Sequence, residues 1–106
     1  MVTLAGCGSS ATSGKNLEMA DFTQAFEAVG VTVDTSEKPE FAMIGAEDGV
    51  IFYVDDNPVK IYKYGSKADL EKAKKDFSFM AECPVNGTFV LETSQDKAKE
   101  IFNSVK

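Results

Sequence analysis

The chain has no histidine, no arginine and no tryptophan. Without histidine it lacks the usual general base near neutral pH and the commonest transition-metal ligand, which excludes Ser-His-Asp triads and ordinary zinc hydrolases. All 11 basic residues are lysine, so no bidentate fork is available for phosphate or a guanine edge. A formal net charge of -6 also disfavours nucleic acid, which we therefore exclude as a partner.

Cysteine is scarce, with Cys7 and Cys83 as the two thiols. No histidine or arginine can lower the pKa of Cys83, so we expect a small buried apolar side chain there and no nucleophile. No apolar run approaches the roughly 20 residues of a membrane-spanning helix. With 106 residues, of which 43% are hydrophobic and 26% charged, the chain has the composition of one globular domain.

The N-terminal segment carries the most informative motif. Leu4-Ala5-Gly6-Cys7 resembles the lipobox of bacterial lipoproteins, and the Gly/Ser/Thr-rich residues 8–16 resemble the flexible tether that follows a lipidated cysteine. The resemblance implies cleavage before Cys7, lipid attachment to it, and a domain held at the membrane outside the cytoplasm.

Six residues precede Cys7, whereas a signal peptide has a basic start and about 7–15 apolar residues. We therefore expect residues 1–6 to be a signal-peptide remnant, residues 8–16 a tether and residues 17–106 a single domain. The alternative is an N-terminal segment with an incidental cysteine.

Apolar spacing predicts three amphipathic helices. The first covers residues 17–29 and ends at Gly30; the second begins at Ser66 and runs to about Phe77; the third begins after a capping Ser94. Residues 31–33 and 88–92 are predicted strands, and residues 78–85 have no clear period.

Residues 41–64 predict a three-stranded meander. Asp48-Gly49 is a type I′ hairpin signal, and residues 55–58 form a second turn cluster. This register places Gly45 opposite Phe52, and Phe52 opposite Ile61. The more apolar face, which we expect to pack on the second and third helices, comprises Phe41, Met43, Phe52, Val54, Val59 and Ile61.

The resulting order, α-β-β-β-β-α-β-α, predicts an α+β fold with about five antiparallel strands and three helices in two layers. On the other face of the meander, aromatic residues with polar tips are typical of contact surfaces. The predicted contact residues are Ile44, Ile51, Tyr53, Tyr62 and Tyr64, unless the first helix covers them.

Asp55, Asp56 and Asn57, with Glu47 and Asp48, have the oxygen atoms of a Ca²⁺ site but not the EF-hand spacing, so we interpret residues 55–57 as a turn. We expect no metal, no cofactor and no catalytic residue. The leading hypothesis is a lipid-anchored, non-catalytic binding module for a protein or another envelope component. The alternative is a small secreted enzyme inhibitor, or a small enzyme that uses carboxylate chemistry.

Overall fold

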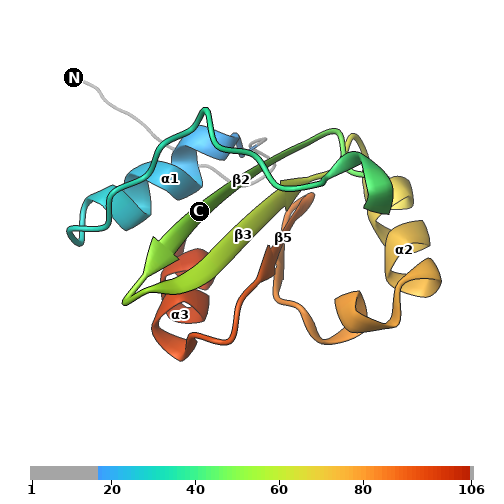
Figure 1. The fold of residues 1–106 in the computed structure, drawn as a ribbon. Coiled ribbons are helices and arrows are strands. Elements are labelled where there is room, and N and C mark those ends of the chain that lie inside the picture. Colours follow the sequence, from blue (N-terminus) through green and yellow to red (C-terminus); the bar gives the residue numbers. More distant parts are fainter. Residues whose placement is uncertain (1–16, 106) are drawn as a thin grey trace, which may run out of the picture.

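In the described part of the chain, four antiparallel strands form one sheet in the order β2-β3-β5-β4, and three α-helices complete an α+β fold (Figure 1). The computed structural model describes residues 17–105. The helices are α1 (Met19–Glu27), α2 (Lys67–Asp76) and α3 (Asp96–Ser104), with two short 3-10 helices, η1 (Ala42–Ile44) and η2 (Ser78–Glu82). The strands are β2 (Asp48–Val54), β3 (Asn57–Lys63), β4 (Val85–Asn86) and β5 (Phe89–Glu92).

The hairpin that organises the sheet turns at Asp55-Asp56. These two residues have φ angles of 51° and 67°, and Val54 pairs with Asn57, which is the pattern of a two-residue type I′ loop. The prediction of a turn at Asp48-Gly49 is wrong, because β2 runs through both residues. Glycine at position 49 instead allows the preceding chain segment to approach β2 closely. A Cβ there would lie 3.1 Å from Cγ of Pro39 and 3.2 Å from Cβ of Phe41.

Residues 41–47 do not form the predicted first strand of the meander. Residues 42–44 form η1 instead, and Gly45 follows it with a φ of 77°, a left-handed conformation that glycine adopts without strain. Gly45 therefore does not face Phe52. The observed register pairs Phe52 with Val59 and Val50 with Ile61, two residues away from the predicted one.

The prediction of about five strands is corrected to four in residues 17–105. In residues 31–33 the side chains alternate in direction as expected, and Val31 and Val33 pack on the core. These residues nevertheless pair with no strand among the described residues. Strand β4 was not predicted. It pairs with β5 across a turn at Gly87, whose φ of 65° suits the first position of a type II′ loop.

The first face of the sheet packs against α1 and α3 (Figure 1). Phe22 of α1 stacks on Phe102 of α3 with ring centroids 4.9 Å apart, and Phe26 meets Phe52 of β2 at 4.8 Å. The prediction that Phe52, Val54, Val59 and Ile61 are core residues is confirmed. The predicted helix partners were partly wrong, since α1 and not α2 joins α3 on this face. Two other expected core residues do not reach it: Phe41 is half-buried in the other cluster, and Met43 is 73% exposed.

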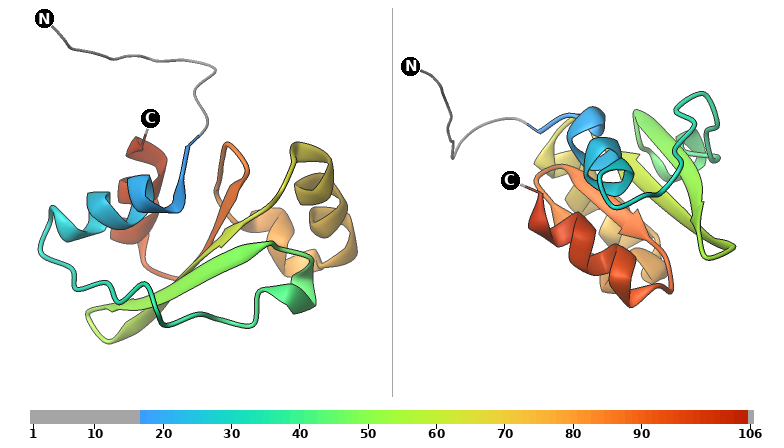
Figure 2. Two further views of the ribbon diagram at one scale, coloured as in Figure 1. Left: turned by 90° about the horizontal axis from the view of Figure 1, so that it is seen from above. Right: turned by 90° about the vertical axis from the view of Figure 1, so that its left-hand side faces the viewer.

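The second face is covered over part of its length by α2 and η2. Tyr62, Tyr64 and Val90 pack there with Leu70 of α2 and Met80 of η2. Helices therefore lie on both faces of the sheet, so the fold has three layers and not the predicted two (Figure 2).

Two predicted helix starts differ in outcome. Ser66 caps α2, since its hydroxyl accepts a hydrogen bond of 3.1 Å from the backbone N–H of Asp69. Ser94 does not cap α3, which begins after Gln95; the N–H of Gln95 donates to the hydroxyl of Thr93 instead.

Candidate binding surface

Of the five predicted contact residues, two are buried, two are half-buried and one is exposed. Tyr62 and Tyr64 are 5% and 1% exposed beneath α2 and η2, so the prediction that they form an outer contact surface is wrong. Ile44 lies half-buried in η1 and packs against the cluster that contains Tyr62 and Tyr64, and Ile51 is half-buried in β2. Tyr53, near the end of β2, is 55% exposed. Among the five, only Tyr53 presents most of its side chain to solvent.

Hydrogen bonds hold the two buried tyrosines in place. The hydroxyl of Tyr64 donates to the carbonyl oxygen of Ile44 at 2.9 Å and lies 3.4 Å from Sδ of Met80. The hydroxyl of Tyr62 donates to Oε1 of Glu92 at 2.9 Å. Burial raises the pKa of Tyr64 to about 12, and burial together with the carboxylate of Glu92 raises the pKa of Tyr62. Both phenols therefore remain neutral parts of the core at physiological pH.

Among residues 17–105, no helix packs over the rest of the second face. We call this surface the open half of the second face; strand alternation and register place on it Ile51 and Tyr53 of β2, Pro58 and Lys60 of β3, and Glu92 of β5. None of these five residues is buried. Pro58 pairs with Tyr53 and lies beyond the end of the β3–β5 pairing, so its missing N–H costs the sheet no hydrogen bond.

A groove of about 510 Å³ lies over β3 and β5 on the open half. Pro58, Lys60 and Glu92 form part of its lining, and η2 contributes Phe79, which is 45% exposed. Residues around Phe79 have no clear period in the sequence, so sequence patterns could not place it beside β3. The lining also carries lysines and glutamates, which leaves the groove without a dominant sign of charge.

Cys83 lines this groove and is half-buried. Its Sγ lies 3.4 Å from the carbonyl oxygen of Phe79, where the thiol is a weak donor. Burial raises the pKa of the Cys83 thiol, and the nearby carboxylate of Glu92 raises it further. The thiol therefore stays protonated at neutral pH, although Cys83 is half-buried and not buried as predicted.

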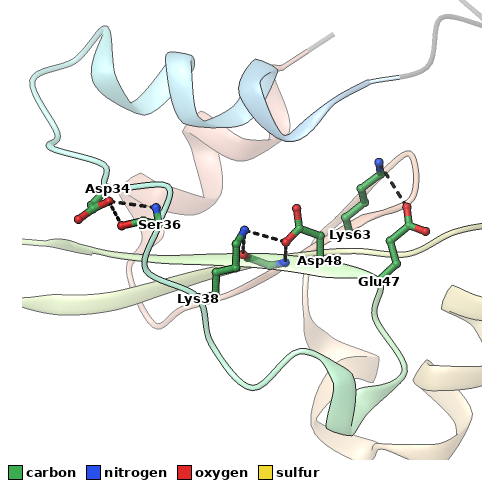
Figure 3. A network of polar contacts seen from close by, with 7 residues as sticks. Asp34, Ser36, Lys38, Glu47, Asp48 and Lys63 are labelled. Atoms are coloured by element: carbon green, nitrogen blue, oxygen red, sulfur yellow. Dashed lines mark hydrogen bonds and ion pairs between the residues drawn. The ribbon is translucent and has the colours of Figure 1, made fainter.

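The outer edge of β2 is covered over only part of its length. The chain segment before η1 runs beside the strand, and the carbonyl oxygen of Glu37 accepts a hydrogen bond of 3.3 Å from the N–H of Ile51. Further along, Nζ of Lys38 lies 2.8 Å from Oδ1 of Asp48 and also donates to the carbonyl oxygen of Gly49 (Figure 3). These contacts occupy the first half of the edge.

The second half of the edge, at Tyr53, has no such cover. Residues two apart in a strand direct their N–H groups to the same side, so the N–H of Tyr53 points outward like that of Ile51. Within residues 17–105 it meets no backbone acceptor. A segment of edge strand is therefore available for pairing at Tyr53.

A hollow of about 310 Å³ adjoins this part of the edge, and we call it the edge hollow. Its lining comprises Thr32, Asp34, Glu37, Ile51, Phe52 and Tyr53. Asp34 Oδ1 accepts hydrogen bonds from the backbone N–H of Ser36 at 3.0 Å and from its hydroxyl at 2.6 Å (Figure 3). These bonds lower the pKa of Asp34, so its carboxylate is ionised at neutral pH. The edge hollow therefore carries two carboxylates and no lysine.

The oxygen-bearing residues considered for Ca²⁺ lie at opposite ends of β2. Glu47 and Asp48 precede the strand or begin it, whereas Asp55 and Asp56 follow its last residue. Their carboxylates also have separate roles at the first end, where Glu47 pairs with Lys63 at 3.3 Å and Asp48 with Lys38. In the described part of the chain, no three Asp, Glu, Cys or His side chains group as metal ligands would.

Lipid attachment at Cys7 was predicted for a residue outside the described ones. The described chain starts at Leu17, which packs on the first-face core and whose Cδ1 lies 3.7 Å from the position of a Cβ at Gly87. Across residues 17–105, none of the helices has the length and apolar character needed to cross a membrane.

Comparisons of the chain with protein-family models, with curated proteins and with solved structures give no match, so the surface is interpreted from its own geometry.

Proposed function

We propose that this chain is a lipoprotein tethered to a membrane outside the cytoplasm, and that its domain is a non-catalytic binding module. Cys7 is the proposed site of lipid attachment, because it completes the lipobox-like Leu4-Ala5-Gly6-Cys7. Residues 8–16, rich in glycine, serine and threonine, supply the tether.

The observation that carries the proposal is the position of Leu17, the first described residue, relative to the accessible strand edge. Leu17, where the tether joins the domain, lies at the Gly87 turn, and β5 begins there opposite Lys63. The Asp55-Asp56 turn lies at the other end of β3, where Asn57 pairs with Val54 (Figure 2). Six residue steps of β3 separate the two ends, or about 20 Å at the usual strand rise. Tyr53, which pairs with Pro58 beside this turn, therefore lies at the end of the sheet opposite Leu17.

Two accessible features at this distal end support binding. Among the described residues, the N–H of Tyr53 on the β2 edge has no backbone acceptor. The exposed side chain of Tyr53 lies on the open half of the second face and also lines the edge hollow. Exposed aromatic residues and open strand edges are both used in protein recognition.

Lipid labelling tests the proposal. The complete precursor is expressed in a bacterium supplied with a fatty acid that carries an alkyne, and the protein is then analysed for label and for partition into a detergent phase. We expect the wild type to be labelled and detergent-soluble, and Cys7→Ser to be neither. Cys83→Ser is the matched control, because it removes the other thiol and should keep the label. Equal labelling of the wild type and Cys7→Ser, or an unlabelled wild type, would contradict the proposal.

A further inference from the structure

We infer that the open part of the β2 edge, at Tyr53, binds an extended peptide segment that carries lysine or arginine. The inference rests on the proposed binding function and names the site and the chemistry of its partner. Three features of the described residues support it: an outward N–H at Tyr53 without a backbone acceptor, a group of carboxylates around that edge, and an accessible aromatic residue.

The strand edge supplies main-chain hydrogen bonds. The outward N–H of Ile51 is taken by the carbonyl oxygen of Glu37, whereas the outward N–H of Tyr53 has no backbone acceptor within residues 17–105. An extended segment beside Tyr53 would therefore continue the edge pairing that Glu37 begins. Strand addition of this kind gives affinity through main-chain bonds and leaves specificity to the side chains of the peptide.

Charge around the site favours a cationic segment. Asp34 and Glu37 line the edge hollow, and Asp55 and Asp56 form the turn that follows β2. Lys38 does not neutralise this group, because its Nζ is paired with Asp48 at 2.8 Å.

Among the lysines of the described strands, Lys60 is the one nearest to this group by register. It pairs with Ile51 from β3, so it lies one strand inward from the edge. A lysine or arginine side chain directed from the peptide into the edge hollow would thus meet two carboxylates, which is the complementary arrangement of charge.

Tyr53 adds a surface that suits the same partner. Tyr53 is 55% exposed and lines the edge hollow, so its ring is accessible to a peptide paired beside it. Ammonium and guanidinium groups are attracted to the face of such a ring.

The same charges disfavour other occupants. If two copies of the chain paired through their β2 edges, the carboxylates of Asp34, Glu37, Asp55 and Asp56 of both copies would be brought together. Like charges so placed are repelled, and an anionic lipid surface would be repelled for the same reason.

Peptide titration of the isotope-labelled full chain, followed by NMR, tests the inference. The probe is a capped hexapeptide of alternating lysine and valine, and the comparison peptide replaces each lysine with glutamate. We expect the lysine peptide to shift the amide signals of Ile51 and Tyr53, and the glutamate peptide to bind at least tenfold more weakly. A third peptide, N-methylated at alternate residues, should lose binding because it cannot pair with the edge.

Matched variants separate local recognition from general attraction to an acidic protein. Asp34→Asn with Glu37→Gln removes two charges at the edge hollow, whereas Glu71→Gln with Asp76→Asn removes two exposed charges on α2. We expect the first pair to weaken binding about tenfold more than the second. Equal weakening, shifts centred on α2, or equal binding of the N-methylated peptide would overturn the inference.

This outcome is independent of the lipoprotein proposal. Failure of the peptide to bind at Tyr53 would remove the inferred partner while leaving lipid attachment at Cys7 intact. Failure of Cys7 to be labelled would remove the tether while leaving peptide binding measurable.

Discussion

The phenolic oxygen of Tyr62 lies 2.9 Å from Oε1 of Glu92, diagonally across the β3–β5 pair. Tyr62 is buried beneath α2 and η2, whereas Glu92 lines the groove on the open half of the second face. The hydrogen bond therefore joins the covered part of this face to the uncovered part. The side chains beneath α2 and η2 are buried, and those on the uncovered part remain accessible to a partner.

Burial on both faces predicts similar losses of stability from Phe52→Ala and Tyr62→Ala. Phe52 lies on the first face and Tyr62 on the second, and they are 2% and 5% exposed. We expect each substitution to lower the free energy of unfolding by about 3–5 kcal/mol, the usual cost of truncating a large buried aromatic residue. Urea denaturation of the full chain measures both. Tyr53→Ala is the control and should change stability by less than about 1 kcal/mol. A loss for Tyr62→Ala as small as that for Tyr53→Ala would show that the second face is not covered.

Gly49→Ala should loosen the segment that runs beside β2. The added Cβ would lie 3.1 Å from Cγ of Pro39 and 3.2 Å from Cβ of Phe41, both closer than ordinary contact. We expect a loss of about 1–3 kcal/mol from overpacking. The matched control is Gly65→Ala, whose Cβ would meet the mobile end of the Glu47 side chain at 3.3 Å. Equal denaturation midpoints for the two variants would contradict the close approach at Gly49.

The turn between β2 and β3 offers a stabilising substitution. Asp56 has a φ of 67°, in the left-handed region that glycine adopts without the steric cost of a Cβ. Asp56→Gly should raise the free energy of unfolding by about 0.5–1 kcal/mol, whereas Asp56→Ala should lower it. Thermal and urea unfolding of the two variants provide the comparison. Stabilisation by alanine would indicate a different turn.

Tyr64 should make the fold sensitive to alkali. Burial raises its pKa to about 12 from an ordinary value near 10, so the folded state favours the neutral phenol. Its contribution is therefore complete below about pH 10 and is lost as the pH rises to about 12. Between these values, the stability of the wild type should fall more steeply with pH than that of Tyr64→Phe. Tyr53→Phe, at an exposed site, should retain the wild-type slope. Equal slopes for the wild type and Tyr64→Phe would contradict the burial of this phenol.

Several sheet and helix positions could be predicted from the sequence because local patterns decide them. The apolar spacing of residues 67–76 and the capping Ser66 predict α2, and alternation predicts the core positions on β2 and β3. The predicted register was wrong by two residues, but an even shift leaves Phe52 and Val59 on the same face. The predicted core positions on β2 and β3 are therefore correct although the predicted turn is wrong.

The choice between two turn signals could not be made locally. Asp48-Gly49 and Asp55-Asp56 both favour positive φ, and only the second pair adopts it. Position 49 is instead determined by Pro39 and Phe41, which are ten and eight residues earlier in the chain. The prediction of the contact surface was partly wrong for a similar reason. Strand alternation places Tyr62 and Tyr53 on the same face of the sheet. The placement of α2 and η2 buries Tyr62 and leaves Tyr53 exposed.

Amide hydrogen exchange at Tyr53 tests most directly whether the β2 edge is open. In the free full chain, the N–H of Phe52 faces β3, and that of Ile51 is bonded to Glu37 at 3.3 Å. The N–H of Tyr53 points outward without a backbone acceptor among residues 17–105. NMR-detected exchange should therefore be at least about 100-fold faster at Tyr53 than at Phe52, since an unbonded amide exchanges without the opening that a bonded one requires. Protection of Tyr53 equal to that of Phe52 would mean that the edge is already occupied, and would contradict the proposed binding surface.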